Sequence, residues 1–222
     1  MGAEIVWARG GERQTALQHT FDQAWADGHR PYLIPYGGSN PVGAAAYAYA
    51  LEELLNQGET PDWIVFATSS GGTQAGLAAG ARRSGYKGHI LGISVDEPAA
   101  ALQRRVAVLA GETADRLGIK NSFTPEEILV NDHYLGRGYG VMGEAEREAI
   151  QLLASCEGLL LDQVYTGRAA AGLIELVRQG FFKPNETVLF WHTGGTPALF
   201  APGYSELLTT NPCLPVTSPF SP

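Results

Sequence analysis

Short apolar runs alternate with longer amphipathic patterns along most of the chain. Runs of β-branched and aromatic residues predict strands, and apolar residues three or four positions apart predict helices. The predicted strands are residues 3–8, 30–36, 62–68, 89–96, a short part of 125–134, 159–167 and 186–195. The predicted helices are residues 14–28, 37–58, 74–84, 98–118, 143–158 and 168–180. This alternation predicts βαβ units, and therefore an α/β fold in which helices cover both faces of a parallel sheet.

Local signals mark the ends of the helix at 37–58 and of the ordered chain. Ser39 or Asn40 is suited to cap that helix, because a short polar side chain accepts a hydrogen bond from a free backbone N–H group. Pro41 takes the first helical position, and Gly58 ends the helix. Residues 202–222 are rich in proline, serine and threonine and predict a loose C-terminal tail.

Composition narrows the classes of function. A net charge of −8 and a pI near 5.1 argue against nucleic acid or an anionic membrane as the partner. The chain has no apolar run of about 18 residues and no basic N-terminus followed by an apolar block, so neither a membrane span nor a signal peptide is predicted. We therefore expect a cytoplasmic protein. Cys156 and Cys213 have no histidine partner at metal-ligand spacing, which predicts free thiols and no metal site.

Candidate chemistry gathers in loops rich in glycine and hydroxyl groups, each placed after a predicted strand. These loops are residues 36–40, 68–76, 164–168 and 192–197. In an open parallel sheet, ligands bind beyond the carboxyl ends of the strands. The loop at 68–76 leads from a strand into a helix, which is a common way to bind a phosphate with backbone N–H groups. It contains no lysine, so it is not the P-loop of a nucleotide-binding protein.

This set of motifs resembles the tryptophan-synthase-like, fold type II pyridoxal-phosphate enzymes. Within them it is most similar to the family of D-cysteine desulfhydrase and 1-aminocyclopropane-1-carboxylate (ACC) deaminase. The segments that carry the resemblance are "PYLIPYGGSNPVGAAAYA" (31–48), "SSGGTQAGLAAG" (69–80), "GRGYGVMGEAEREAI" (136–150), "VYTGRAAAGLIELVRQG" (164–180) and "VLFWHTGGTPALFA" (188–201). The resemblance implies pyridoxal 5'-phosphate as cofactor and a small amino acid as substrate.

The resemblance also implies roles for individual residues. Tyr139 and Tyr165 are similar to the two active-site tyrosines of the family, where a phenol orients the substrate or relays a proton. Asn40 and Ser39 are candidates for substrate contact, although helix capping alone explains both, and His192 is better explained as a packed strand-end residue. The implied cofactor-binding residues are Ser69, Ser70, Gly71, Gly72 and Thr73 for the phosphate, and Thr166, Thr193, Gly194 and Gly195 around the ring.

One position separates the two branches of the family. The deaminase branch resembles Tyr-Glu-Gly at the site that reads "YTG" here, and its carboxylate keeps the pyridine nitrogen protonated. This chain has the neutral residues Thr166 and Thr193 instead. The resemblance therefore favours a D-cysteine desulfhydrase-like β-elimination that gives pyruvate, ammonia and sulfide, with ACC deamination as the alternative.

The family's Schiff-base lysine has no counterpart in the chain. The three lysines, Lys87, Lys120 and Lys183, lie in predicted turns, and none follows the Gly-Asn pair that the family places before its lysine. We expect that the chain lacks the N-terminal part of the family and that it is inactive alone. On this interpretation residues 1–36 are a remnant of the smaller domain and residues 37–201 form the larger, cofactor-binding domain.

Two other interpretations stay open at this point. A separate chain that supplies the missing N-terminal segment would restore an enzyme, whereas a phosphate- or cofactor-binding fragment would have no turnover. The resemblance also implies a homodimer. A Rossmann-type nucleotide binder is disfavoured, because no G-x-G-x-x-G follows the first predicted strand.

Overall fold

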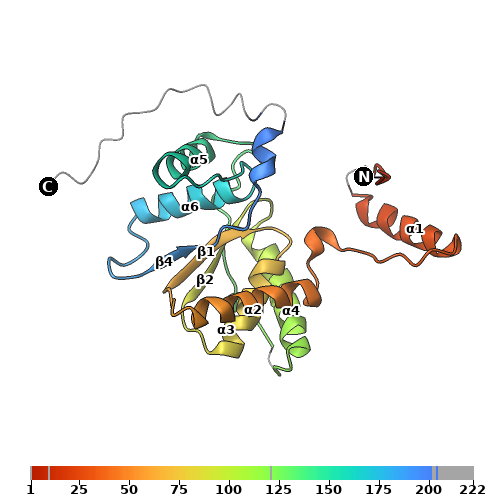
Figure 1. Ribbon diagram of the computed structural model, residues 1–222, viewed down its shortest axis with the longest axis horizontal. Helices are drawn as coiled ribbons and strands as arrows, with labels where there is room; N and C mark the ends of the chain where they lie inside the picture. Colours follow the sequence, from red (N-terminus) through yellow and green to blue (C-terminus); the bar gives the residue numbers. More distant parts are fainter. Residues whose placement is uncertain (1, 10, 121, 202–203, 205–222) are drawn as a thin grey trace. The chain divides into compact units, whose positions relative to one another are not determined.

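A computed structural model gives the structure of residues 2–9, 11–120, 122–201 and 204. The chain divides into two compact units, Met1–Gly38 and Ser39–Pro222. The larger unit contains a four-stranded sheet with the order β3-β2-β1-β4, in which every neighbouring pair is parallel (Figure 1). The sheet and the helices around it confirm the predicted α/β class.

The sheet is built from two six-residue strands flanked by two shorter ones. These strands are β1 (Trp63–Thr68), β2 (His89–Ser94), β3 (Leu129–Asn131) and β4 (Val188–Phe190). The register pairs Ile64 with Ile90 on one side of β1 and with Leu189 on the other. All four carboxyl ends therefore point to one edge of the sheet, called the carboxyl edge below, and all four amino ends to the opposite, amino edge.

Helices cover both faces of this sheet (Figure 1). One layer consists of α2 (Pro41–Asn56), α3 (Gly72–Ser84) and α4 (Ala99–Arg116), and the other of α5 (Glu144–Glu157) and α6 (Thr166–Arg178). The alternation of side chains along β1 explains the two layers. Ile64 and Phe66 are buried with Leu51 of α2 and Leu77 of α3, whereas Val65 is buried with Ala169 and Leu176 of α6.

Glycine permits unusually close packing between α2 and α3. A Cβ atom added at Gly76 would lie 2.0 Å from the carbonyl oxygen of Ala44, and one at Gly80 would lie 2.8 Å from the Cα atom of Ala48. The backbones of the two helices thus touch along one stripe of small residues. This contact places the start of α2 beside the start of α3, where the predicted phosphate loop lies.

The smaller unit differs from its prediction. It contains α1 (Arg13–Ala26) and the 3₁₀ helix η1 (Tyr36–Gly38), and its described residues form no strand at 3–8 or 30–36. A strand must exchange backbone hydrogen bonds with a neighbour, and no described residue of this unit supplies one. Apolar composition alone made these two segments resemble strands.

The predicted strand at 159–167 is also wrong. Its backbone N–H groups at Val164, Tyr165 and Thr166 bond to the carboxylate of Asp162, and the chain then turns directly into α6. An internal carboxylate thus takes the donors that a sheet ladder would need. The remaining predicted strands and all predicted helices are confirmed, with ends that differ by a few residues, and two further 3₁₀ helices lie at Pro125–Glu127 (η2) and Thr196–Phe200 (η3).

Other predictions concern features outside the core. The division into residues 1–36, 37–201 and 202–222 stays a prediction, and almost all of the predicted tail, like Cys213, lies outside the described residues. Cys156 is exposed and free. Within the described ranges no helix has the length and apolar character needed to cross a membrane, and no three metal-ligating side chains are grouped.

Candidate functional site

The chain turns sharply where β1 leads into α3 at the carboxyl edge. Gly71 adopts φ +91°, a left-handed conformation that a side chain would strain, and it precedes the first residue of α3. No side chain within this turn caps the helix. Because the first backbone N–H groups of an α-helix have no acceptor inside it, those of Thr73 and Gln74 are directed out of the helix start.

Ser39, from the residue pair before α2, completes this helix start. Its hydroxyl group donates to Ser70 Oγ (2.8 Å) and accepts from the Gly72 N–H group (3.1 Å). A Cβ atom at Gly72 would lie only 2.6 Å from Ser39 Oγ, so this approach requires glycine. Asn40, the predicted substrate residue, caps α2 through Oδ1, which accepts from Gly43 N–H at 2.8 Å. Its substrate role stays a prediction.

A charged cluster lies directly behind the turn. Ser69, predicted to bind phosphate, donates from its hydroxyl group to Asp96 Oδ2 at 2.6 Å. Arg105 of α4 donates to the Ser69 carbonyl oxygen (3.0 Å) and to Glu97 (2.6 Å). Sequence reasoning missed this cluster, because its charged members lie on a different strand end and helix. It fixes the shape of the turn from the side of β2 and α4.

The turn fits a phosphate group. Outward N–H groups, the positive end of the α3 dipole, Ser70 and the first-turn residue Thr73 lie at one helix start, which is the donor set that binds phosphates. Glycine at 71 and 72 lets the turn pack closely, because a Cβ atom at these positions would lie 2.8 Å from Val106 and 2.6 Å from Ser39 Oγ. Four of the five predicted phosphate residues line this start, while the Ser69 hydroxyl is turned toward Asp96.

Tyr139 and Tyr165, the two predicted catalytic residues, meet in space although 26 positions separate them. Their hydroxyl groups are hydrogen-bonded to each other, and their rings are 5.9 Å apart at an angle of 76°. Tyr139 is 53% exposed. In such a pair one phenol donates and the other accepts, and the acceptor retains its own hydroxyl proton for a further partner.

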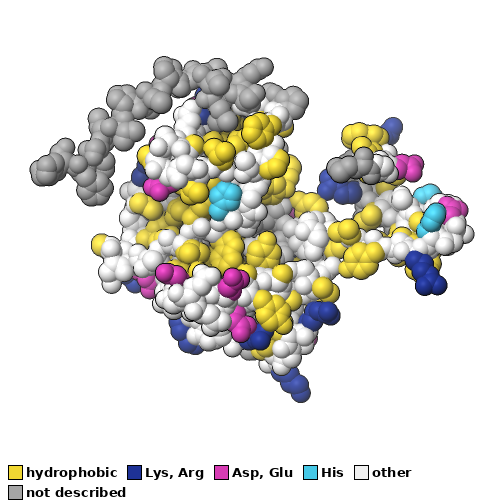
Figure 2. All heavy atoms as spheres, viewed as in Figure 1, with side chains coloured by type: hydrophobic (Ala, Val, Ile, Leu, Met, Phe, Trp, Pro, Cys, Tyr) yellow, Lys and Arg dark blue, Asp and Glu magenta, His cyan; other side chains and the backbone are white. Residues whose placement is uncertain are grey.

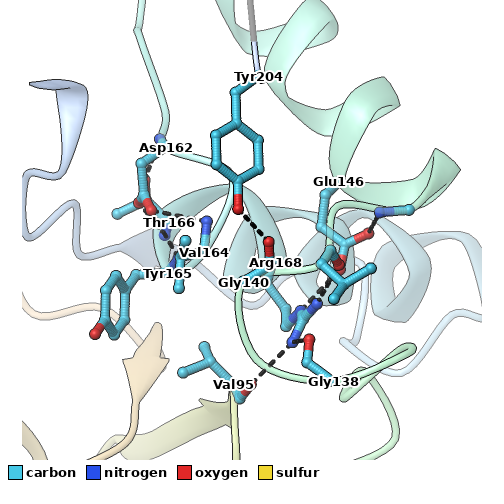
Figure 3. A network of polar contacts seen from close by, with 12 residues as sticks. Val95, Gly138, Gly140, Glu146, Asp162, Val164, Tyr165, Thr166, Arg168 and Tyr204 are labelled. Atoms are coloured by element: carbon cyan, nitrogen blue, oxygen red, sulfur yellow. Dashed lines mark hydrogen bonds and ion pairs between the residues drawn. The ribbon is translucent and has the colours of Figure 1, made fainter. Parts of the chain in front are cut away.

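Tyr165 is held by Asp162, which caps the start of α6 (Figure 3). The buried carboxylate accepts from the N–H groups of Val164, Tyr165 and Thr166 at 2.8–2.9 Å. It also accepts from the hydroxyl group of Thr166 at 2.8 Å. Thr166, predicted to contact the cofactor ring, is thus buried and bonded to Asp162. Its observed role is to fix the Tyr165 turn, and its cofactor role stays a prediction.

The second glycine loop, Thr193–Gly195, follows β4 and lies against the same aspartate. Gly195 has φ +99°, and a Cβ atom there would lie 2.6 Å from Asp162 Oδ1, whereas one at Gly194 would have no neighbour within 4 Å. Thr193 is exposed. His192 accepts from the Gly194 N–H group at Nδ1 (3.0 Å) and faces the Leu160 carbonyl oxygen from Nε2 (3.1 Å). The neutral Nε2–H tautomer satisfies both bonds, which agrees with a packing role.

The phosphate turn and the tyrosine pair are linked through the end of β2. Val95 donates its N–H to the Thr68 carbonyl oxygen (3.1 Å), next to the turn. The Val95 carbonyl oxygen accepts from the guanidinium of Arg168 in α6 (2.8 Å), three residues after Tyr165. Sequence reasoning missed both Arg168 and Asp162. For Arg168 the sequence offered no signal. For Asp162 it offered one, because an acidic residue four positions before Thr166 can accept a hydrogen bond from the start of the following helix.

The three lysines lie away from this site. Lys87, Lys120 and Lys183 precede β2, β3 and β4 respectively, and each is exposed on the amino side of the sheet. Lys183 pairs with Glu186 at 3.4 Å. A cavity of about 490 Å³ also opens at the amino edge, next to Lys87, but none of the predicted site residues lines it.

The fold of this chain is similar to that of a known protein. A crystal structure described as an ACC deaminase homologue superposes with a TM-score of 0.80 and is 31% identical, over 92% of this chain and 61% of that one. The chain therefore spans less than two thirds of the length of that homologue. A threonine deaminase from T.th. is 21% identical over 85% of this chain and 62% of that one, but its TM-score of 0.43 is too low to bear on function. The model of the family described as "Pyridoxal-phosphate dependent enzyme" matches residues 1–194. The chain belongs to the pyridoxal-phosphate-dependent enzyme family.

Proposed function

We propose that this chain forms the cofactor-binding part of a pyridoxal-phosphate-dependent lyase or deaminase that acts on a small amino acid, most like D-cysteine desulfhydrase. The observation that carries the proposal is the presence of two features at one edge of the sheet. One is the hydroxyl-lined start of α3 around Ser39 and Ser70, and the other is the hydrogen-bonded pair of Tyr139 and Tyr165. A phosphate-binding start and a proton-handling pair are what such an enzyme requires.

In this proposal, different residues of the chain bind the phosphate and handle the proton. Ser70, Thr73 and the outward N–H groups of α3 hold the phosphate, while Ser39 keeps Ser70 and Gly72 in place. When bound, the cofactor supplies an electron sink that makes the α-proton of an amino acid acidic. Tyr139 or Tyr165 holds or moves a proton at its phenolic oxygen, next to the reacting amino acid.

The neutral residues Thr166 and Thr193 support the desulfhydrase-like reaction. Elimination of a thiolate removes electrons with the leaving group, so it depends less on a strongly polarised cofactor ring than deamination does. Among the described residues around Tyr165, the nearest carboxylate is that of Asp162, which is buried in the cap of α6. ACC deamination is the second candidate, because the solved structure that is 31% identical is described as an ACC deaminase homologue.

We also propose that catalysis needs a lysine from outside this sequence. The three lysines of the chain lie on the amino side of the sheet, opposite the tyrosine pair. The outer edge of β4 offers a place for a further strand, because in the described residues β4 pairs with β1 alone. Hydrophobic side chains lie along the middle of the face seen in Figure 2, where Figure 1 places β4 between α6 and α2. A lysine-bearing segment, in the same or a separate polypeptide, is the occupant that we propose.

The experiment measures cofactor binding and chemistry separately. Pyridoxal phosphate is titrated against the purified protein by tryptophan fluorescence, with a Ser70→Ala/Thr73→Ala variant and with Ser84→Ala, at the far end of α3, as control. We expect the double variant to bind the cofactor about tenfold or more weakly, because two phosphate hydrogen bonds are lost, and Ser84→Ala to bind as the wild type does. Equal binding by all three proteins contradicts the proposed phosphate site at the start of α3.

Turnover tests the second half of the proposal. Borohydride reduction followed by mass spectrometry should fix no cofactor to Lys87, Lys120 or Lys183, and the chain alone should release no pyruvate from D-cysteine. Addition of the lysine-bearing segment of the ACC deaminase homologue should restore pyruvate release, or ammonia release from ACC if the second candidate is right. An adduct at any of the three lysines contradicts the lysine proposal, and cofactor binding without turnover in the completed protein favours a non-catalytic module.

A further inference from the structure

Arg168 is a fully buried arginine whose guanidinium group is surrounded by acceptors. Nε donates to Glu146 Oε1 at 2.7 Å, and the two terminal nitrogens donate to three backbone carbonyl oxygens. These belong to Val95 (2.8 Å), Gly138 (3.1 Å) and Val141 (2.9 Å). All three nitrogens of the side chain are thus used. Figure 3 shows this convergence at the start of α6.

The acceptors come from three separate parts of the fold. Val95 directly follows β2, Glu146 lies in the first turn of α5, and Gly138 and Val141 flank Tyr139 in the loop between β3 and α5. The other carboxylate oxygen of Glu146 accepts from Gly143 N–H at 2.9 Å, at the end of the same loop. Arg168 and Glu146 together therefore hold the Tyr139 loop on both sides of the tyrosine.

The loop depends on such support. Gly136, Gly138 and Gly140 all have positive φ angles, and glycine-rich backbone of this kind has many accessible conformations. Arg168 itself lies in the first turn of α6, three residues after Tyr165. It is therefore attached to one tyrosine through its own helix and to the other through the loop carbonyls.

A purely structural role explains this arrangement less well. A buried ion pair is weak evidence for stability, because well-packed apolar residues of similar size often stabilise a protein as much. Apolar side chains, however, cannot bind three carbonyl oxygens and a carboxylate at defined positions, whereas the planar guanidinium group can. What arginine adds here is a fixed geometry of the loop.

We infer that Arg168, supported by Glu146, is a positioning residue that holds the hydroxyl group of Tyr139 against that of Tyr165. Its meaning for catalysis rests on the proposed function, in which these two phenols handle the proton. The positioning itself is a property of the folded chain and is tested without cofactor. A failure of cofactor binding would therefore affect the proposed function and leave this inference standing.

The test compares Arg168→Lys with Arg178→Lys in the full chain. Lysine keeps the charge but cannot reach four acceptors at once. Arg178 is the matched control, because it also lies on α6 and pairs with a glutamate of α5, Glu148, but on the surface at 2.5 Å. The readout is the ¹³Cζ NMR signals of the tyrosines, nine in the sequence, assigned with Tyr139→Phe and Tyr165→Phe.

The expected result concerns the signal of Tyr165. In Tyr139→Phe this signal shifts, because Tyr165 loses the hydroxyl group of Tyr139. In Arg168→Lys it should move to the same position, while Arg178→Lys should keep the wild-type position. Trypsin should also cleave after the exposed Arg137 about tenfold or more faster in Arg168→Lys, since the loop is released. A merely structural role would lower the unfolding temperature without shifting the Tyr165 signal of the folded protein.

Two outcomes overturn the inference. One is a folded Arg168→Lys whose Tyr139 and Tyr165 signals match the wild type. The other is an unchanged Tyr165 signal in Glu146→Gln, which is the variant to measure if Arg168→Lys does not fold. Glutamine still accepts from Arg168 through its oxygen, but its amide nitrogen cannot accept from the Gly143 N–H group. A partial shift of the Tyr165 signal in Glu146→Gln supports the inference, and an unchanged signal refutes it.

Discussion

The backbone of Gly195 lies so close to Asp162 that a methyl group on Gly195 would come within 2.6 Å of the Oδ1 atom of the aspartate. The same oxygen accepts from the N–H and hydroxyl groups of Thr166 at 2.8 Å. One buried carboxylate therefore joins the loop after β4 to the turn that carries Tyr165. The distance between these two parts of the site depends on a glycine at position 195.

Alanine at position 195 should separate the two parts. Gly195→Ala meets two obstacles, a φ angle of +99° and the contact with Asp162, whereas Gly194→Ala meets only a φ angle of +102°. We expect both variants to lose about 1–2 kcal/mol from the left-handed conformation, and Gly195→Ala to lose about 1–3 kcal/mol more from overpacking. Urea unfolding of both variants measures the difference. Equal losses would show that the aspartate gives way without cost.

Removal of the Ser39 hydroxyl should weaken anion binding at α3. Ser39→Ala loses the bonds to Ser70 Oγ and the Gly72 N–H group, which shape the helix start. One neutral hydrogen bond contributes about 0.5–1.5 kcal/mol, so we expect inorganic phosphate to bind about 2- to 10-fold more weakly. Isothermal titration measures this affinity. Tighter binding in Ser39→Ala would mean that Ser39 competes with the anion for the Gly72 N–H group.

A single added methyl group should also disturb the packing between α2 and α3. Gly76→Ala would place Cβ 2.0 Å from the Ala44 carbonyl oxygen, so the two helices must move apart. We expect a loss of about 1–3 kcal/mol or more in the free energy of unfolding. Gly111→Ala in α4 is the control, because its Cβ would meet nothing within 4 Å. There alanine should stabilise the helix by up to about 1 kcal/mol.

The difference in unfolding free energy between Gly76→Ala and Gly111→Ala shows whether the fold needs the close contact between α2 and α3. If Gly76→Ala were as stable as Gly111→Ala in chemical unfolding, the close contact between the helices would not be needed for the fold. If it also lowers phosphate affinity, the stripe positions the start of α3, since Gly72 and Gly76 lie on the same helix.

Periodicity was enough to predict the sheet and its helices, because each element of the larger unit buries one side. The alternation of Ile64, Val65 and Phe66 between two helical layers is the clearest example. The same reasoning failed at 3–8 and 30–36, where apolar residues occur without a neighbouring strand among the described residues. An apolar sequence pattern shows that a segment could form a strand, but whether a neighbouring strand is present to pair with it depends on the fold.

The candidate site divides in the same way. Glycine and hydroxyl groups at strand ends were visible as motifs, and the resemblance assigned Tyr139 and Tyr165 to one site, whereas the hydrogen bond between them is visible only in the structure. Arg168 and Asp162 were not found, because the sequence alone does not distinguish a buried charged residue from one on the surface. Only the fold reveals that Arg168 is fully buried and bonded to separate parts of the chain.

Alkaline pH should destabilise the fold through Tyr86, at the amino edge. Burial and the negative charge of Asp62 raise the pKa of Tyr86 from 10.0 to about 12, and its hydroxyl group donates to the Pro61 carbonyl oxygen at 2.5 Å. The folded state thus retains a proton that the unfolded state releases. The stability that this proton contributes is complete below pH 10.0 and is lost as the pH rises toward about 12.

Substitution isolates this contribution from those of the other tyrosines. Tyr86→Phe cannot titrate and lacks the bond to Pro61, so at pH 7 it should be about 1 kcal/mol less stable than the wild type. The gap should narrow as the pH approaches 11.5, because only the wild type loses the contribution of Tyr86. Tyr49→Phe, at a position that is 53% exposed, serves as control in the same denaturant titrations. A gap for Tyr86→Phe that stays constant from pH 8 to 11.5 would mean that folding does not change the proton affinity of this phenol.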